Sequence, residues 1–561
     1  MESRTELSGW PRLVKYDLVT IVLVGMATHG LLLLMDGVYF DDYLLYDHLT
    51  ANDWPLMNQW ISQAGQQLAW SFYRAMGMLP DIIFGCRLIA FLSITLTAVF
   101  WYLVCFETRI LSRWESLLMS LIQLTFPAFR ATFCLVVLIY LVCYFLFVAG
   151  VYTAVRSYIG RGWHRLVLRV VSLLLFFVSF STNSLLVFYL GFIVFMVFLV
   201  RRRNLVSIRA AAKKYLPRHI DFLLLPFVYW GIRECLTPRW GVYETYNRLH
   251  VSLKDLVLQF VRFIPNAVLF QLNDALLQLL AFPALWLVFI AAMVFVYIKI
   301  GRRAVVTFES PASPRSLITV GVALVLLAIL PYALVSKIAT VVGWNTRHSL
   351  LVSIGVGVVI VGVFKAVCSA PGGRLSRAGV AVAASLVLAF ATTMIDSYIS
   401  WQMRWVKDHS VEVHLKNMPP CPASTYWIDD QFPLPREISL EPYQDYEWST
   451  IFKNAWGGET RTGIYPGTDL ASYDRTRGEN YRTGGWGRIC NLSGYDASGQ
   501  QARLTVRPGP FASGIKMVLW YWWYRYAGRN AFDAYVRKVT EVTLTMLPDP
   551  QAAPSPDIPT D

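Results

Sequence analysis

Long apolar runs recur along most of the chain and constrain its fold more than any other feature. Between Leu18 and Ile395 they repeat many times, and the longer ones reach the roughly 17–25 residues that a helix needs to cross about 30 Å of hydrocarbon. The chain of 561 residues is 56% hydrophobic and only 15% charged, which is more apolar surface than a water-soluble protein can bury. The sequence therefore predicts a polytopic, mainly α-helical membrane protein.

The basic residues predict how often the chain crosses the membrane, because Lys and Arg accumulate in cytoplasmic loops. The densest basic cluster is "RRRNLVSIRAAAKKYLPR", which begins at Arg201. With the N-terminus in the cytoplasm, this cluster lies on the same side only if the apolar runs at 115–154 and 166–200 are each divided into two spans by a turn. The spans expected on this basis, about eleven in number, are 17–35, 82–105, 115–127, 131–155, 166–181, 184–200, 219–236, 279–299, 316–335, 349–368 and 378–398.

The composition changes after Tyr398, where the apolar runs end and Gly, Pro, Arg and aromatic residues become frequent. We predict a transmembrane unit over 1–400, a soluble domain over 401–547 and a disordered, Pro-rich tail over 548–561. In the soluble domain a helix continues from the last span, and "TYWIDDQF" and "ARLTVRP" indicate strands, so an α/β fold is expected. An odd number of spans puts this domain outside the cytoplasm.

The charge and the cysteines exclude some functions. The formal net charge is +14, but most basic residues flank apolar runs, where they set topology, so no nucleic-acid partner is expected. No Cys-x-x-Cys pair and no His/Cys cluster predicts zinc. Cys421 and Cys490 lie in the predicted soluble domain, and they could form one disulfide if that domain is outside the cell.

An acidic segment, "MDGVYFDDYLLYDHL", directly follows the first predicted span. Asp36 and Asp42 have a purely structural interpretation, as a turn residue and a helix cap. Asp41 and Asp42 are adjacent, and because neighbouring carboxylates repel, the pair also suggests a bound cation, an arginine partner or a general base. The loop by itself leaves both interpretations open.

Four basic residues on the predicted outer side run against the usual charge bias. They are Arg130 in the turn after Pro127, Lys337 at the end of a span, and Arg347 and His348 in "GWNTRHS". Contact with lipid headgroups would explain each of them singly. An anionic phosphate would explain them together, because arginine binds phosphate through paired hydrogen bonds. We therefore predict that these residues form a phosphate site near the Asp pair.

Two further segments are predicted to lie on the membrane surface. In the loop 238–277, "VSLKDLVLQFVRFIPNAVLF" repeats apolar residues near the helical period, with Lys254, Asp255 and Arg262 interrupting them. Near the C-terminus, "MVLWYWWYRYAG" is too short to span but is rich in the aromatic residues found at the membrane interface.

A polytopic protein with an acidic "DD" motif in its first outward loop resembles the GT-C superfamily, membrane glycosyltransferases that use polyprenyl-phosphate sugars. Here the motif is "FDDY", with Asp41 and Asp42, and the outward Arg347 and His348 and the C-terminal domain are also similar. The layout resembles bacterial O-antigen and surface-polysaccharide glucosyltransferases. The resemblance implies a GT-C-like bundle in the inner or plasma membrane. It also implies inverting transfer of a sugar from the lipid phosphate to a glycan or glycolipid acceptor on the outer face.

The resemblance also implies roles for the site residues. Asp41 would deprotonate the acceptor hydroxyl, an effect worth about 10²–10⁴-fold in rate. Asp42 would orient the acceptor or, together with Asp41, hold a divalent metal such as Mg or Mn, whose use differs within the superfamily. Arg347 would stabilise the polyprenyl phosphate leaving group, with the three other outward basic residues as further candidates.

Other functions remain open from the sequence. A transporter or flippase for lipid-linked glycans would place ionisable residues mid-span, whereas the spans here hold few beyond Arg87 and Arg169, both near span ends. A polysaccharide polymerase or ligase also uses outward arginines and a lipid-phosphate leaving group, but it would be expected to place its site in a long central loop. A non-catalytic assembly factor would use the soluble domain to bind partners.

Overall fold

The computed structural model describes residues 12–160, 162–204, 207–237, 240–244, 249, 252–281, 310, 312–367, 377–458, 460–483 and 485–548. Helices make up 73% of the structure, which confirms the mainly helical fold. The predicted span at 279–299 lies outside the described residues from 282 onward, and so does the predicted tail beyond Pro548. The α-helices and strands are α1 (Arg12–His29), α2 (Asp42–Thr50), α3 (Trp54–Gln63), α4 (Gln67–Gly77), α5 (Ile82–Thr108), α6 (Arg113–Thr125), α7 (Leu138–Ile159), α8 (Trp163–Ser179), α9 (Asn183–Asn204), α10 (Ile208–Tyr215), α11 (Ile220–Leu236), α12 (Leu253–Ile264), α13 (Phe270–Ala281), α15 (Pro314–Ala333), α16 (Val352–Val367), α17 (Arg377–Lys416), β1 (Thr425–Asp430), α18 (Arg436–Ser439), α19 (Asp445–Trp456), β2 (Thr462–Ile464), α20 (Leu470–Tyr473), α21 (Glu479–Thr483), α22 (Gly485–Ile489), β3 (Gln501–Pro508), α23 (Gly514–Ala527), α24 (Arg529–Val536) and β4 (Thr540–Met546).

Several helices are long and apolar enough to cross a membrane, as the sequence predicted. Within the described residues there are seven such segments, which supports assignment as a membrane protein, while the count of about eleven spans and the orientation stay predictions. The segments are Leu13–Leu34, Ile82–Thr108, Leu138–Ile159, Asn183–Asn204, Leu253–Gln278, Pro314–Ala333 and Gly379–Lys416.

Turns divide both of the long apolar runs, as the basic cluster at Arg201 requires. α6 ends at Thr125, before Pro127, and α7 begins only at Leu138. α8 ends at Ser179, and α9 begins four residues later. α6 has only 13 residues, about 20 Å of helix, so it is shorter than the hydrocarbon core. The division of these runs into separate helices is therefore confirmed.

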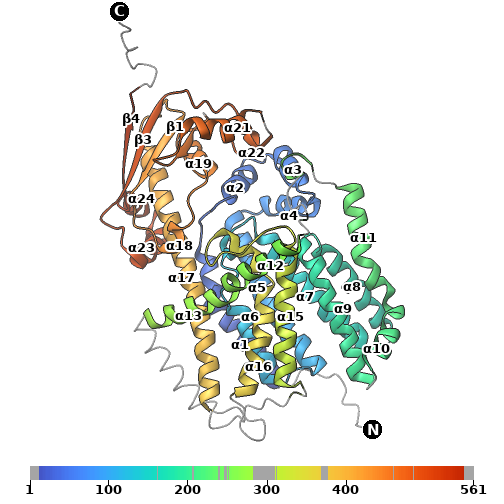
Figure 1. The fold of residues 1–561 in the computed structure, drawn as a ribbon. Coiled ribbons are helices and arrows are strands. Elements are labelled where there is room, and N and C mark those ends of the chain that lie inside the picture. Colours follow the sequence, from blue (N-terminus) through green and yellow to red (C-terminus); the bar gives the residue numbers. More distant parts are fainter. Residues whose placement is uncertain are drawn as a thin grey trace, which may run out of the picture.

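The segment predicted to lie on the membrane surface is longer than expected. α12, a π-helical turn at Pro265–Leu269 and α13 follow one another without a break. By length and composition this stretch is sufficient for a membrane span, which the sequence analysis did not expect. Figure 1 shows α13 crossing α17 rather than running alongside it.

The acidic loop after α1 folds into three short helices at one end of the bundle, α2, α3 and α4 (Figure 1). α2 buries Leu44, Leu45 and Leu49, which attach the loop to the core. At the start of α3, the side chain of Asp53 accepts a hydrogen bond from the Leu56 N–H at 3.3 Å, as an N-cap residue does. Local sequence thus explains the helices, and the apolar faces explain their position.

The C-terminal part contains a four-stranded sheet at the same end of the bundle (Figure 1). The strand order is β2-β1-β3-β4, with β1 parallel to both neighbours and β4 antiparallel to β3. Both strands predicted from the sequence, β1 and β3, are present. α17 runs for 40 residues from the bundle into this region, which confirms that a helix continues beyond the last apolar run.

The sheet region is joined to the first loop through buried charges on α17 and α19. Arg404 Nη2 donates to Glu447 Oε1 at 2.5 Å, and both side chains are fully buried. Glu447 Oε1 also accepts the Phe40 N–H at 2.9 Å.

Cys421 and Cys490 are both free, so the disulfide that these two cysteines could have formed is absent.

Candidate functional site

The backbone just before the Asp pair is held in an unusual conformation. Phe40 has φ of 52°, in the left-handed region that bulky residues rarely adopt. Its N–H is bound by Glu447, and its ring packs against Trp344 and Trp401, with centroids 5.2 and 5.0 Å away. These contacts maintain the strained backbone and so determine the direction of Asp41, the next residue.

The two adjacent carboxylates have different surroundings. Asp41 is partly exposed, lines a cavity and accepts a hydrogen bond from the Tyr446 hydroxyl at 2.5 Å. Asp42 is fully buried, with Oδ1 accepting the Val136 N–H at 2.8 Å and Oδ2 accepting the Tyr39 N–H at 3.4 Å. Only Asp41 is available to a substrate, whereas Asp42 attaches the loop to the segment before α7.

Burial changes the acidity of both side chains. It raises the pKa of Asp41, although the Tyr446 hydrogen bond and the positive charge of Arg347 act in the opposite direction. Burial raises the pKa of Asp42 to about 7, against the charge of Arg87 and the backbone hydrogen bonds. A carboxylate with a raised pKa is a better proton acceptor near neutral pH, which suits Asp41 to general-base chemistry.

Asp41 opens into a cavity of about 410 Å³ that combines charged and apolar walls. Asp41 is its only lining carboxylate among the described residues, against the basic side chains of Arg233, Lys337 and Arg347. The cavity therefore carries a positive charge and favours an anionic ligand. Its apolar wall includes Leu186, Val187, Trp230, Leu249, Leu334 and Val335.

Arg347 is the best-placed cation of this cavity. Its guanidinium stacks over the Trp344 ring at 4.0 Å and donates to the Trp344 carbonyl at 3.1 Å. Within the described part of the chain it forms no ion pair with a carboxylate. The guanidinium is thus oriented by an aromatic ring, while hydrogen-bonding positions remain for a ligand.

Two further residues of the predicted phosphate site, Lys337 and His348, also line the cavity. Lys337 follows Ser336, whose φ of 55° turns the chain after α15. His348 Nδ1 lies 2.9 Å from the Ile338 carbonyl, which can only accept, so this nitrogen carries the proton. Burial, with Arg347 as the next cause, lowers the pKa of His348 to about 3. The ring is neutral and its Nε2 is an acceptor, so His348 does not donate to a phosphate.

The structure adds Arg233 on α11, which the sequence analysis did not select. Its side chain is 9% exposed, donates to Asn183 Oδ1 at 2.9 Å and lines the cavity. It lies near the end of the predicted span at 219–236, where no functional residue was expected. Like Arg347, it is a cation near the predicted outer side of the membrane, and this is the sequence signal by which it could have been predicted.

The structure does not bring Arg130 into the cavity. Its side chain is 2% exposed and turns toward Gln271, with Nη2 donating to Gln271 Oε1 at 2.8 Å. It also pairs with Asp274, and its Nη1 lies 3.4 Å from Glu437 Oε2. Two carboxylates occupy this guanidinium, so it has no free face for a lipid phosphate.

The Asp pair does not fit a shared metal ion. The Asp42 oxygens are bound by backbone N–H groups, while Asp41 faces the cavity and Tyr446. Throughout the described residues no group of three or more His, Cys, Asp or Glu side chains could hold a metal. The donor set in this region therefore gives no support to a resident Mg or Mn site.

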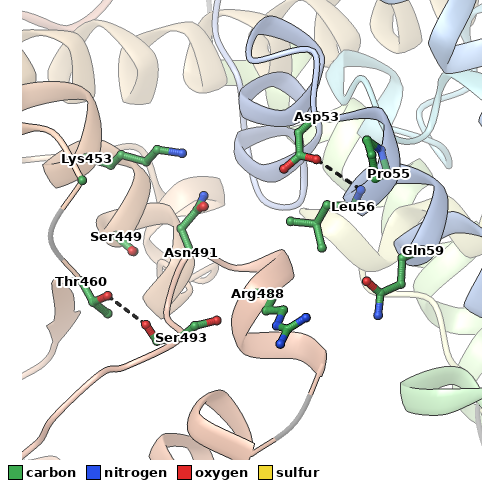
Figure 2. Close-up of a pocket in the computed structure, with 11 residues that line it drawn as sticks. Asp53, Pro55, Leu56, Gln59, Ser449, Lys453, Thr460, Arg488, Asn491 and Ser493 are labelled. Atoms are coloured by element: carbon green, nitrogen blue, oxygen red, sulfur yellow. Dashed lines mark hydrogen bonds between the residues drawn. The ribbon is translucent and has the colours of Figure 1, made fainter.

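A second, more polar pocket of about 530 Å³ lies between α3 and the C-terminal part, where α19, α22 and the loops that follow these two helices line it (Figure 2). Asp53, Leu56 and Gln59 line it from α3 and its cap, and Lys453 and Arg488 line it from the opposite side. Lys453 is paired with Asp47 at 2.7 Å. The other lining residues are Pro55, Ser449, Gly458, Thr460, Asn491 and Ser493.

Comparison with known proteins does not identify the chain. No model of a protein family matches it, and no curated protein matches its sequence. The cavity residues therefore carry the functional argument.

Proposed function

We propose that this protein is an inverting membrane glycosyltransferase that moves a sugar from a polyprenyl-phosphate donor to a hydroxyl of a glycan or glycolipid. One observation carries the proposal: Asp41 and Arg347, which are far apart in the sequence, line the same cavity. A general base and a phosphate-binding cation are the two groups that this transfer requires. The resemblance of "FDDY" to GT-C enzymes supports the same assignment.

The lipid donor matches both kinds of wall in the cavity. Its phosphate would bind Arg347, Lys337 and Arg233. These three basic side chains outnumber the single carboxylate of the described cavity lining. Its polyprenyl chain would lie along the apolar wall formed by α9, α11 and the segment after α15. A water-soluble nucleotide sugar would have no use for an apolar wall of this kind, so a lipid-linked donor fits better.

The proposed reaction is a single displacement. The Asp41 carboxylate accepts the proton of the acceptor hydroxyl, and the hydroxyl oxygen attacks the anomeric carbon of the donor sugar. The bond from that carbon to the phosphate oxygen breaks, and its electron pair leaves with the phosphate. Arg347 and Lys337 stabilise the charge that develops on the phosphate. One displacement inverts the anomeric configuration.

Tyr446 and Asp42 act as positioning residues in this scheme. The Tyr446 hydroxyl, from α19, donates a hydrogen bond to Asp41, and Asp42 fixes the loop by accepting a hydrogen bond from the backbone of Val136. His348 contributes a neutral ring beside Tyr332, 5.0 Å between centroids, and shapes the cavity without adding charge.

The test is transfer from radiolabelled polyprenyl-phosphate glucose, galactose, mannose and arabinose to membranes of cells from which the gene has been deleted. Protein purified into nanodiscs is expected to transfer one of these sugars and to release polyprenyl phosphate in equal amount. The exposed Asp255, which lines neither cavity, provides a control as Asp255→Asn. Absence of transfer from every donor, with no binding of polyprenyl phosphate, would overturn the proposal.

A further inference from the structure

The polar pocket shown in Figure 2 and the Asp41 cavity share two structural elements. α3 contributes Gln59 to the polar pocket and the next residue, Trp60, to the Asp41 cavity. α19 contributes Tyr446, which binds Asp41, and also Ser449 and Lys453, which line the polar pocket. Residues three and seven positions apart lie on one side of a helix, about 10 Å from end to end. The two sites are therefore neighbours on a common support.

The lining of the polar pocket is chemically suited to sugar hydroxyls. Gln59, Thr460, Asn491 and Ser493 bring neutral groups, all of which can donate or accept a hydrogen bond. Leu56 and Pro55 provide an apolar surface beside them. A sugar ring presents this same combination, hydroxyls that both donate and accept around an apolar face.

Two side chains of the pocket, those of Asn491 and Arg488, have hydrogen-bonding atoms available to a ligand. Asn491 has φ of 56°, a left-handed conformation, and its amide donates to Asp47 Oδ2 at 2.8 Å, which leaves Oδ1 as an acceptor. Arg488 is exposed, and its side chain has no hydrogen bond or ion pair with any described residue. Figure 2 shows it on the side of the pocket opposite Gln59. Arg488, which has no partner among the described residues, and the oriented Asn491 are therefore both available to a bound molecule.

We propose that this pocket binds the distal sugar units of an oligosaccharide acceptor while the hydroxyl to be modified lies at Asp41. The inference rests on the proposed function, and it specifies the acceptor as an extended glycan rather than a single sugar or a simple lipid. The α3 and α19 elements fix the separation of the two sites, so acceptor length becomes a determinant of transfer.

Two substitutions address the pocket without touching the Asp41 cavity. Gly458 lines the pocket, and a Cβ atom added there meets no atom within 4 Å, so Gly458→Trp places a bulky side chain at the pocket without a clash at its Cβ. Arg488→Ala removes an exposed side chain that has no described partner. Arg503→Ala, at an exposed position on β3 that lines neither cavity, is the matched control.

The acceptor for the test is the glycan isolated from cells that lack the gene, used whole and after partial hydrolysis to single sugars. Arg488→Ala is expected to raise KM for the whole glycan roughly tenfold or more, the effect of losing a hydrogen bond to a charged group. Gly458→Trp should raise the same KM because its side chain takes up space that the glycan would occupy. Transfer to the single sugars, and binding of polyprenyl phosphate, should match those of Arg503→Ala and of the unmodified protein.

The outcomes separate the two proposals. An unchanged KM for the whole glycan in both pocket variants, with transfer intact, would overturn the acceptor pocket and leave the glycosyltransferase assignment standing. Loss of polyprenyl-phosphate binding in both variants would also overturn it, because the pocket would then not be distinct from the donor cavity. If the unmodified protein neither binds polyprenyl phosphate nor transfers a sugar, the proposed function itself fails.

Discussion

Two turns of the molecule, 126–133 and 343–349, each contain an arginine that the sequence predicts to bind phosphate. The two arginines differ in burial and in their partners. Arg130, in the first turn, is 2% exposed and paired with Asp274 and Glu437. Arg347, in the second, faces a cavity and is held by the ring and carbonyl of Trp344, with no ion pair to a carboxylate among the described residues. The turns themselves lie close together, since the Ala131 N–H donates to Thr346 Oγ1 at 3.0 Å.

The difference shows that an unusual cation in a loop has two possible uses. Where carboxylates from other helices converge on it, the arginine joins those helices and contributes to stability. Where no described carboxylate is within ion-pairing distance, the arginine stays available to a ligand anion. The same division separates Asp42, bound by backbone N–H groups, from Asp41, which faces the cavity.

The largest expected effect is on the rate of sugar transfer and comes from Asp41, which faces the cavity. Asp41→Asn should lower the rate of sugar transfer by about 10²–10⁴-fold, the usual value of general-base assistance. The asparagine Oδ1 can still accept from Tyr446, so the fold and polyprenyl-phosphate binding should be preserved. Transfer rates and thermal unfolding in nanodiscs measure both. Full activity of this variant would remove Asp41 from the mechanism.

Arg130→Ala should act on stability instead. It leaves Glu437, 7% exposed, as a buried charge without its partner, and breaking such a pair typically costs about 3–5 kcal/mol. Denaturant unfolding of the protein in mild detergent should show a loss of this size. A stable variant with weakened polyprenyl-phosphate binding would break the contrast, because Arg130 would then belong to the ligand site.

Arg347→Ala is the counterpart in the second turn. Its side chain is partly exposed and unpaired among the described residues, so the unfolding temperature should change little. Affinity for polyprenyl phosphate should fall roughly tenfold to a hundredfold, as expected for a charge-assisted hydrogen bond worth about 1.5–3 kcal/mol. Arg347→Lys should recover part of it, since it retains the charge without the paired geometry. Equal affinity in the Ala variant would contradict the assignment.

The last test concerns Asp42 and uses the pH dependence of stability. Its pKa is raised from 3.8 to about 7 in the folded protein, so between these values the folded state binds more protons than the unfolded state. The free energy of unfolding should therefore fall as pH rises from about 4 to about 7, by up to roughly 1.4 kcal/mol per unit, and level off above. Asp42→Asn should flatten this slope. Equal slopes in the wild type and in Asp42→Asn would show that Asp42 is ionised in the fold.

Much of the helical framework could be predicted from the sequence. The apolar runs, the turn at Pro127, the strands β1 and β3 and the continuation of α17 depend on residues close together in the chain. The same local reasoning did not foresee that α12 and α13 form a stretch long enough to span, because Pro265 is accommodated by a π-helical turn instead of ending the helix.

The sequence by itself determined a mainly helical membrane protein, a polar C-terminal part with a sheet, and a short set of charged residues worth examining. Only the tertiary structure decided their uses. Glu437 lies 307 residues from Arg130, and Tyr446 lies 405 residues from Asp41. Whether a charge is neutralised, buried or left facing a cavity depends on such distant partners. No local pattern contains them, which is why Arg130 and Arg347 look alike in the sequence and differ in the fold.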